Sequence, residues 1–135
     1  MVSNAGQELL APLEDVWGFV SEPHHFGDWW PGVAAVEPDR RGFAEGARWQ
    51  LRGAEPTLFR RTHGVSTLVV HRAEPYVFAF HVVQDRLDAE LTLEPGGSET
   101  LARLAVSFPF WRPQRALPSV ALGRLYDLCQ TAAAL

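Results

Sequence analysis

The chain has 135 residues, a formal charge of −4, 47% hydrophobic and 21% charged residues, and a single cysteine. These values fit one globular domain over residues 1–135, large enough to bury a core without a disulfide or a structural metal. One cysteine excludes a disulfide within the chain, and the mild acidity without a basic block argues against nucleic-acid binding.

The start of the sequence lacks the basic residues and the apolar stretch of a signal peptide. No apolar run approaches the ~20 residues that are needed to cross a bilayer. We therefore expect a cytoplasmic protein without a membrane span. All twelve basic residues are Arg, a bias that we attribute to a GC-rich bacterial genome. The oligomeric state stays open.

Residues 11–20 predict the first helix. Pro12 suits the first helical position, and the acidic Glu14 and Asp15 favour the positive end of the helix dipole. Apolar side chains at helical spacing share one face of this segment, namely Leu13, Val16, Trp17 and Val20.

Residues 21–30 predict a second short helical or turn segment, because Pro31 disfavours helical geometry in the residue before it. Alternating apolar and polar side chains then predict two strands, at Val33–Pro38 and at Ala47–Arg52. The segment 53–64 fits neither pattern, so its placement stays open.

Period-two alternation predicts four further antiparallel strands, paired so that large apolar side chains share one face. A two-residue loop at Gln84-Asp85 predicts the inner-face pairs Val82 with Leu87, Phe80 with Ala89, Phe78 with Leu91, and Tyr76 with Leu93. The outer face then carries His81 beside Asp88.

The neighbouring strands are predicted by the same rule. A loop at residues 95–100 places Ala102, Leu104, Val106 and Phe108 opposite Leu93, Leu91, Ala89 and Leu87. A turn at residues 73–75 places Arg72, Val70, Leu68 and Ser66 opposite Tyr76, Phe78, Phe80 and Val82. One apolar sheet face results, and it needs a cover.

The end of the chain supplies that cover. Within residues 111–135 the pattern changes to helical spacing, with an apolar stripe of Leu117, Ala121, Leu125, Leu128 and Ala132. Pro118 either starts this helix or kinks it. This C-terminal helix is the only long helix that the sequence predicts, so we expect it to cover the apolar face of the sheet.

The sequence lacks the usual motifs of metal and nucleotide sites. The five His residues show no His-Glu-x-x-His spacing, and no Gly-rich phosphate loop precedes a helix. The acidic residues of the predicted strands, Asp88 and Glu90, fall on the outer face, which disfavours paired-carboxylate catalysis. We therefore expect neither a metal nor a cofactor.

Four stretches of this sequence resemble the SRPBCC superfamily, which includes START-type lipid carriers, pollen-allergen-like proteins and polyketide cyclases/dehydrases. They are Ala11-Pro12-Leu13-Glu14-Asp15-Val16-Trp17, Trp29-Trp30-Pro31-Gly32-Val33, Val70-His71-Arg72-Ala73-Glu74-Pro75 and Leu91-Thr92-Leu93-Glu94-Pro95-Gly96-Gly97. The resemblance covers nearly the whole chain.

This resemblance implies an α+β helix-grip fold. A curved antiparallel sheet of about six or seven strands wraps a long C-terminal helix, and two short helices follow the first strand. In this superfamily a largely apolar cavity between sheet and helix holds hydrophobic molecules.

The predicted cavity lies between the inner sheet face and the C-terminal helix. Its candidate lining residues are Trp49, Ser66, Leu68, Phe78, Phe80, Leu91, Leu104, Phe108, Leu117, Ala121 and Leu125. The alternative is that the aromatic rings simply fill a core.

The candidate catalytic residues are Tyr76, Arg61 and His63, with Ser66 and Arg72 as further polar groups of the inner face. Tyr76 could instead end a strand with its hydroxyl in water, and Arg72 could extend to the rim. Arg61 and His63 fit a cavity or a solvated edge strand equally well.

The function predicted from the resemblance is binding of an aromatic, polyketide-like or lipid molecule. A polyketide cyclase/dehydrase-like enzyme is one form of this function, in which catalysis consists of holding a flexible chain and moving a proton. The alternative is a non-catalytic carrier or a co-chaperone-like module that contacts other proteins, because the fold alone does not decide function.

Overall fold

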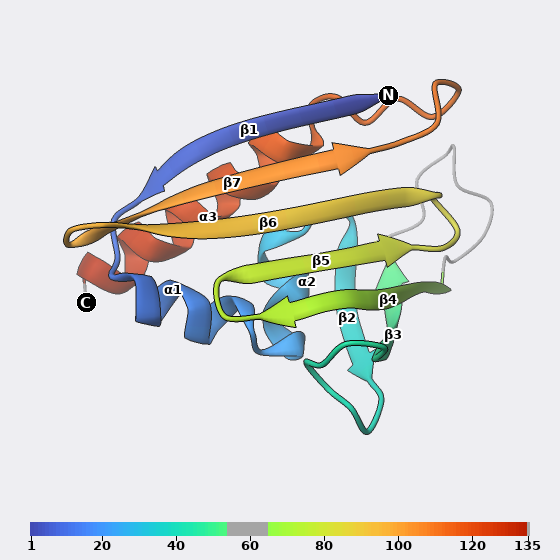
Figure 1. The fold of residues 1–135 in the computed structure, drawn as a ribbon, viewed down its shortest axis with the longest axis horizontal. Helices are drawn as coiled ribbons and strands as arrows, with labels where there is room; N and C mark the ends of the chain where they lie inside the picture. Colours follow the sequence, from blue (N-terminus) through green and yellow to red (C-terminus); the bar gives the residue numbers. More distant parts are fainter. Residues whose placement is uncertain (54–64, 135) are drawn as a thin grey trace.

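The computed structural model describes residues 1–53 and 65–134. A curved, seven-stranded antiparallel sheet carries the helices on one side (Figure 1). The elements are β1 Val2–Leu9, α1 Leu13–Val20, a 3-10 turn Pro23–His25, α2 Phe26–Trp29, β2 Val33–Pro38, β3 Arg48–Gly53, β4 Val65–Glu74, β5 Val77–Val82, β6 Leu87–Gly96, β7 Glu99–Ser107 and α3 Leu117–Ala134. The predicted helix-grip architecture is confirmed.

The strands follow the order β1-β7-β6-β5-β4-β3-β2, so β1 and β2 form the two edges. The registers of β5 with β6 and of β6 with β7 are those predicted, with Phe78 opposite Leu91 and Leu91 opposite Leu104. The loop between β6 and β7 is tighter than predicted, because Gly96 still pairs with Glu99. Gly97 adopts a positive φ of 78° in this turn, which glycine tolerates without strain.

The register of β4 against β5 differs from the prediction by two residues up to Val70 and by three residues from Arg72 onward. Leu68 lies opposite Val82, and the turn consists of Pro75 and Tyr76 rather than residues 73–75. A β-bulge between Val70 and Arg72 turns Arg72 to the outer face, where its guanidinium donates to Glu74 at 2.8 Å. The prediction that Arg72 faces inward is therefore wrong.

The helices cover the concave face of the sheet. Val16 and Val20 of α1 are buried, while Leu13 and Trp17 are half-buried against the same core. Pro118 lies in the first turn of α3 and starts the helix rather than kinking it. The buried side of α3 carries Ala121, Leu122 and Leu125. None of the described helices has both the length and the apolar run that a bilayer crossing needs.

Candidate functional site

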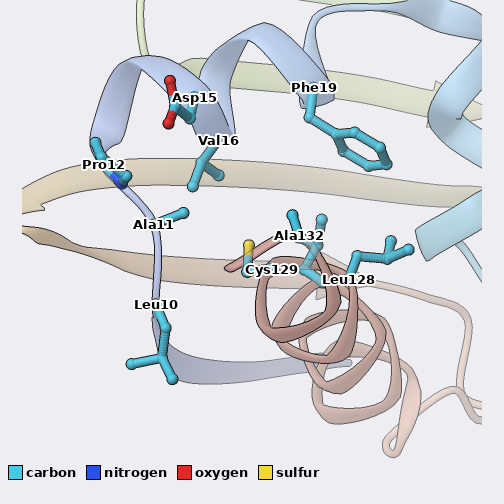
Figure 2. A pocket seen from close by; sticks show the side chains of 10 residues that line it. Leu10, Ala11, Pro12, Asp15, Val16, Phe19, Leu128, Cys129 and Ala132 are labelled. Carbon is cyan, nitrogen blue, oxygen red and sulfur yellow. The ribbon is translucent and has the colours of Figure 1, made fainter. Parts of the chain in front are cut away.

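An apolar groove of about 330 Å³ lies between α1 and the C-terminal half of α3 (Figure 2). The chain that enters α1 closes one end of it. The lining residues are Leu10, Ala11, Pro12, Asp15, Val16, Phe19, Leu125, Leu128, Cys129 and Ala132. The groove thus combines residues from the two ends of the sequence.

The two walls have simple local causes. Leu125, Leu128, Cys129 and Ala132 recur at three- and four-residue spacing, so they share one face of α3. The opposite wall begins where Pro12, with extended backbone, precedes the first turn of α1. The position of this wall is set by a contact between residues that are far apart in the sequence.

That contact joins the start of α1 to β7. The hydroxyl of the buried Thr100 donates a hydrogen bond of 2.8 Å to the carbonyl oxygen of Ala11. The amide of Ala11 in turn donates to the carbonyl oxygen of Leu9 at 2.9 Å. The end of β1 and the sheet therefore hold residues 10–12, at this end of the groove, in place.

The chemistry of the groove is mostly apolar. Among the described residues that line it, Asp15 and Cys129 carry the titratable groups. Asp15 is exposed, whereas partial burial raises the pKa of the Cys129 thiol. The thiol therefore stays protonated at neutral pH, and it is a weak nucleophile. A hydrophobic molecule fits this lining better than a charged one.

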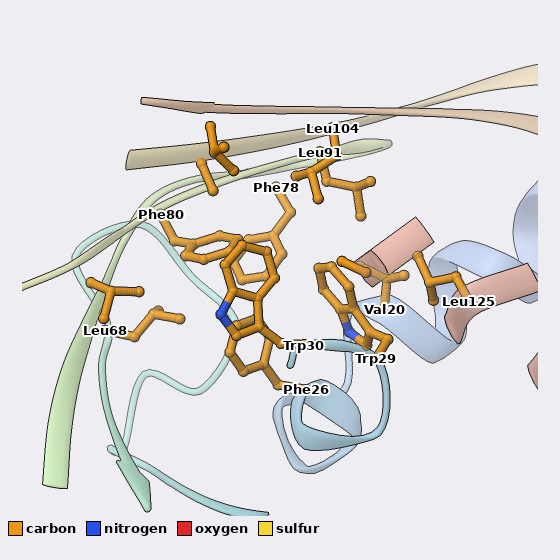
Figure 3. Close-up of a cluster of buried hydrophobic side chains, with 14 of the residues drawn as sticks. Val20, Phe26, Trp29, Trp30, Leu68, Phe78, Phe80, Leu91, Leu104 and Leu125 are labelled. Carbon is orange, nitrogen blue, oxygen red and sulfur yellow. The ribbon is translucent and has the colours of Figure 1, made fainter. Parts of the chain in front are cut away.

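The predicted lining residues lie on the inner faces of their elements, where α2 fills the central space (Figure 3). The Phe26 ring centroid lies 5.3 Å from that of Phe80 and 5.8 Å from that of Trp49. Trp30 stacks on Phe26 at 5.4 Å and meets Phe80 edge-on, with ring centroids 5.0 Å apart. These described aromatic rings therefore contact one another at the centre of the core.

The groove and the predicted lining share one residue, Leu125. Ser66 and Leu117 are half-buried, and the other predicted lining residues are buried in the packed core. Ligand contact by this set remains a prediction.

The catalytic candidate Tyr76 lies outside the groove. It occupies the β4–β5 turn with a positive φ of 70°, and its hydroxyl donates to the carboxylate of Glu14 in α1. This hydrogen bond raises the pKa of the phenol above its usual range. Arg61 and His63 lie outside the described residues.

Sequence reasoning missed most of the groove. The stripe Leu125, Leu128 and Ala132 was visible, but Cys129 and the facing residue Phe19 were not assigned to a site. One signal in the sequence could have indicated this site. The apolar stripe of α3 continues through Leu128 to Ala132, so this part of the helix also needs an apolar partner. A group of metal-ligating side chains, His71, His81 and Asp88, lies on the outer face of the sheet instead.

Comparisons with known proteins agree with this architecture. The family model described as polyketide cyclase / dehydrase and lipid transport matches residues 5–127. No curated protein matches the sequence significantly.

Solved structures share the fold at low sequence identity. XoxI from Bacillus cereus is 10% identical with a TM-score of 0.75, and the match covers 98% of this chain and 97% of that one. Ara h 8.0201 is 9% identical with a TM-score of 0.70, over the full length of both chains. Norcoclaurine synthase from Thalictrum flavum, a point mutant in complex with a transition-state analogue, is 12% identical with a TM-score of 0.67, over 98% and 96% of the chains.

Proposed function

Because the chain belongs to the SRPBCC superfamily, in the family of polyketide cyclases/dehydrases and lipid-transport proteins, we propose that it binds a neutral hydrophobic small molecule between α1 and α3. The observation that carries this proposal is the apolar groove of about 330 Å³. Ligand sites in proteins are typically concave and apolar, with a few polar groups that fix orientation.

The volume limits the size of the ligand. An apolar cavity of ~150 Å³ accommodates benzene, so the groove has room for about two aromatic rings or an acyl chain of comparable volume. The rings of Phe26, Trp30 and Phe80 lie within 5.0–5.4 Å of one another in the described core, so the groove is the apolar space on which this proposal rests. A small, flat or slender molecule therefore fits best.

The lining also favours a neutral ligand. No Arg or His is among the described residues that line the groove, so an anionic headgroup finds no charged partner there. The exposed carboxylate of Asp15 at the groove disfavours an anion further.

The same lining favours a carrier over a catalyst. Acyl or aldol chemistry needs a base within hydrogen-bond reach of the reacting group, and often a second group that stabilises the developing charge. In the described groove the neutral Cys129 thiol and the rim carboxylate of Asp15 do not form such a pair. Tyr76, a catalytic candidate among the described residues, lies outside the groove, and its hydroxyl donates a hydrogen bond to the carboxylate of Glu14.

The test is a titration with 6-propionyl-2-(dimethylamino)naphthalene, a neutral two-ring naphthylamine dye whose fluorescence rises in apolar surroundings. We expect micromolar affinity, about −8 kcal/mol. Ala132→Trp fills the groove and should weaken binding at least tenfold. Ala116→Trp, an exposed site just before α3, is the matched control and should bind like the parent.

A second variant separates the groove from the central space. Phe80→Leu changes the packed core and should leave the affinity of the folded protein within threefold of the parent. Binding that survives Ala132→Trp but is lost in Phe80→Leu would move the ligand to the centre. No binding below millimolar dye would refute the proposed function.

A further inference from the structure

The outer face of the sheet brings together three side chains with metal-binding groups. His71 lies on β4, His81 on β5 and Asp88 on β6, three strands that are adjacent in the sheet. His81 is the direct cross-strand partner of Asp88. His71 lies in the β4 bulge, two residues beyond Val69, the partner of His81. The three ligand groups therefore come from a rigid, hydrogen-bonded part of the molecule.

Their separations are close to those of a coordination site. Asp88 Oδ1 lies 2.9 Å from His81 Nδ1 and 4.0 Å from His71 Nε2. The ligand atoms of all three residues lie within 4.8 Å of one another. Zinc bonds of about 2.0–2.2 Å at tetrahedral angles place ligand atoms roughly 3.3–3.6 Å apart. Shifts of about 1 Å, available by side-chain rotation, would complete the geometry.

We propose that His71, His81 and Asp88 bind a divalent transition-metal ion, with Zn²⁺ as the reference ion and water in the remaining position. Two imidazoles and one carboxylate suit Zn²⁺, Ni²⁺ or Cu²⁺ better than Mg²⁺ or Ca²⁺, which prefer oxygen ligands. The side chains are 55%, 30% and 60% exposed in that order, so the ion can enter from solvent.

The surroundings support a bound cation. Glu90, the next outward residue on β6, pairs with the small Ala79 and adds negative charge beside the cluster. Together with His71 and Asp88, these two residues line a shallow hollow of about 260 Å³. The neighbouring Arg72 is held by Glu74, with their nitrogen and oxygen atoms 2.8 Å apart. The water position would thus open onto a hollow that is lined by the carboxylate of Glu90.

A simple cross-strand ion pair between His81 and Asp88 is the competing account of this geometry. An exposed pair of that kind contributes little to stability, and it gives no role to His71. The two accounts differ in what happens when His71 is removed. A metal site loses a ligand, whereas the His81–Asp88 pair keeps both partners.

The experiment is isothermal titration of the untagged protein with Zn²⁺, repeated with Co²⁺ to record its visible absorption. We expect one ion per chain, micromolar affinity for Zn²⁺, and the intense Co²⁺ bands of four-coordinate geometry. His71→Ala and His81→Ala should each weaken binding at least about tenfold. His24→Ala is the matched control, because His24 is another exposed His beside a carboxylate, and it should have no effect.

Asp88→Asn tests the carboxylate and should also weaken Zn²⁺ binding. Binding of the naphthylamine dye should persist in all these variants, because the groove lies on the other side of the sheet; this shows that they are folded. Failure to bind Zn²⁺ below millimolar would overturn the proposal. So would Zn²⁺ affinity that is unchanged by His71→Ala.

Discussion

Trp17 packs α1 against two connections between strands of the sheet. Its replacement by Ala should lower the free energy of unfolding by about 2–3 kcal/mol. Its ring packs edge-on against Phe43 of the β2–β3 connection, with centroids 5.4 Å apart, and against Tyr76 of the β4–β5 turn at 5.9 Å. A fully buried Trp costs about 3–5 kcal/mol when truncated to Ala. Trp17 is only half-buried, so less free energy of transfer from water is lost on truncation. The loss of the two aromatic contacts adds to the cost, which gives the intermediate value.

The assay is urea unfolding followed by circular dichroism. Trp111→Ala is the matched control, because Trp111 is 58% exposed and its loss should cost less than about 0.5 kcal/mol. A double-mutant cycle of Trp17→Ala with Phe43→Ala should give a coupling of about 0.5–1.5 kcal/mol. The folded Trp17→Ala protein should also bind the dye more weakly, because α1 forms one wall of the groove. If Trp17→Ala costs no more than Trp111→Ala, the inferred packing is wrong.

Two further predictions concern individual residues. The melting temperature of Tyr76→Gly should lie about 2–4 °C above that of Tyr76→Ala. Both changes remove the phenol, but only glycine adopts the positive φ of this position without strain. Equal melting temperatures would contradict the left-handed backbone conformation of this turn. Cys129 should react with iodoacetamide more slowly than in the urea-unfolded chain, because its raised pKa lowers the thiolate fraction, and saturating dye should slow it further. Reaction as fast as in the unfolded chain would show that the folded protein does not shield the thiol, and a rate unchanged by bound dye would contradict its place in the groove.

The alternation of apolar side chains was sufficient to predict the pairing of β5, β6 and β7 and their inner face. Phe78, Leu91 and Leu104 belong on one face in any register that keeps large apolar groups together, so β5, β6 and β7 could be aligned without a structure. The long helix followed from the need to cover that face. These features depend on local pattern and on burial, both of which are visible in the sequence.

The groove depends on contacts between distant residues. The hydrogen bond from Thr100 to Ala11 spans 89 residues and helps to place α1 relative to α3. The filling of the centre depends on how the four-residue helix α2 directs the rings of Phe26 and Trp30. A short segment with three large aromatic residues has no helical face that could be read from spacing. Its sequence therefore indicated a helix or turn without showing what its rings would contact.

The bulge in β4 connects the register error with the proposed metal site. The inward side chains of β5 are even-numbered, and so are those of the first half of β4. A two-residue turn pairs even-numbered with odd-numbered residues, so without an extra residue it would send the apolar side chains of one strand outward. The unpaired His71 supplies that residue, turns Arg72 outward and leaves Tyr76 in the turn.

The predicted register would have separated His71 from His81 by four residues, ~13 Å along the strands. In the actual pairing His71 and His81 are diagonal neighbours on adjacent strands. The bulge that makes the predicted register wrong therefore also brings the two imidazoles together.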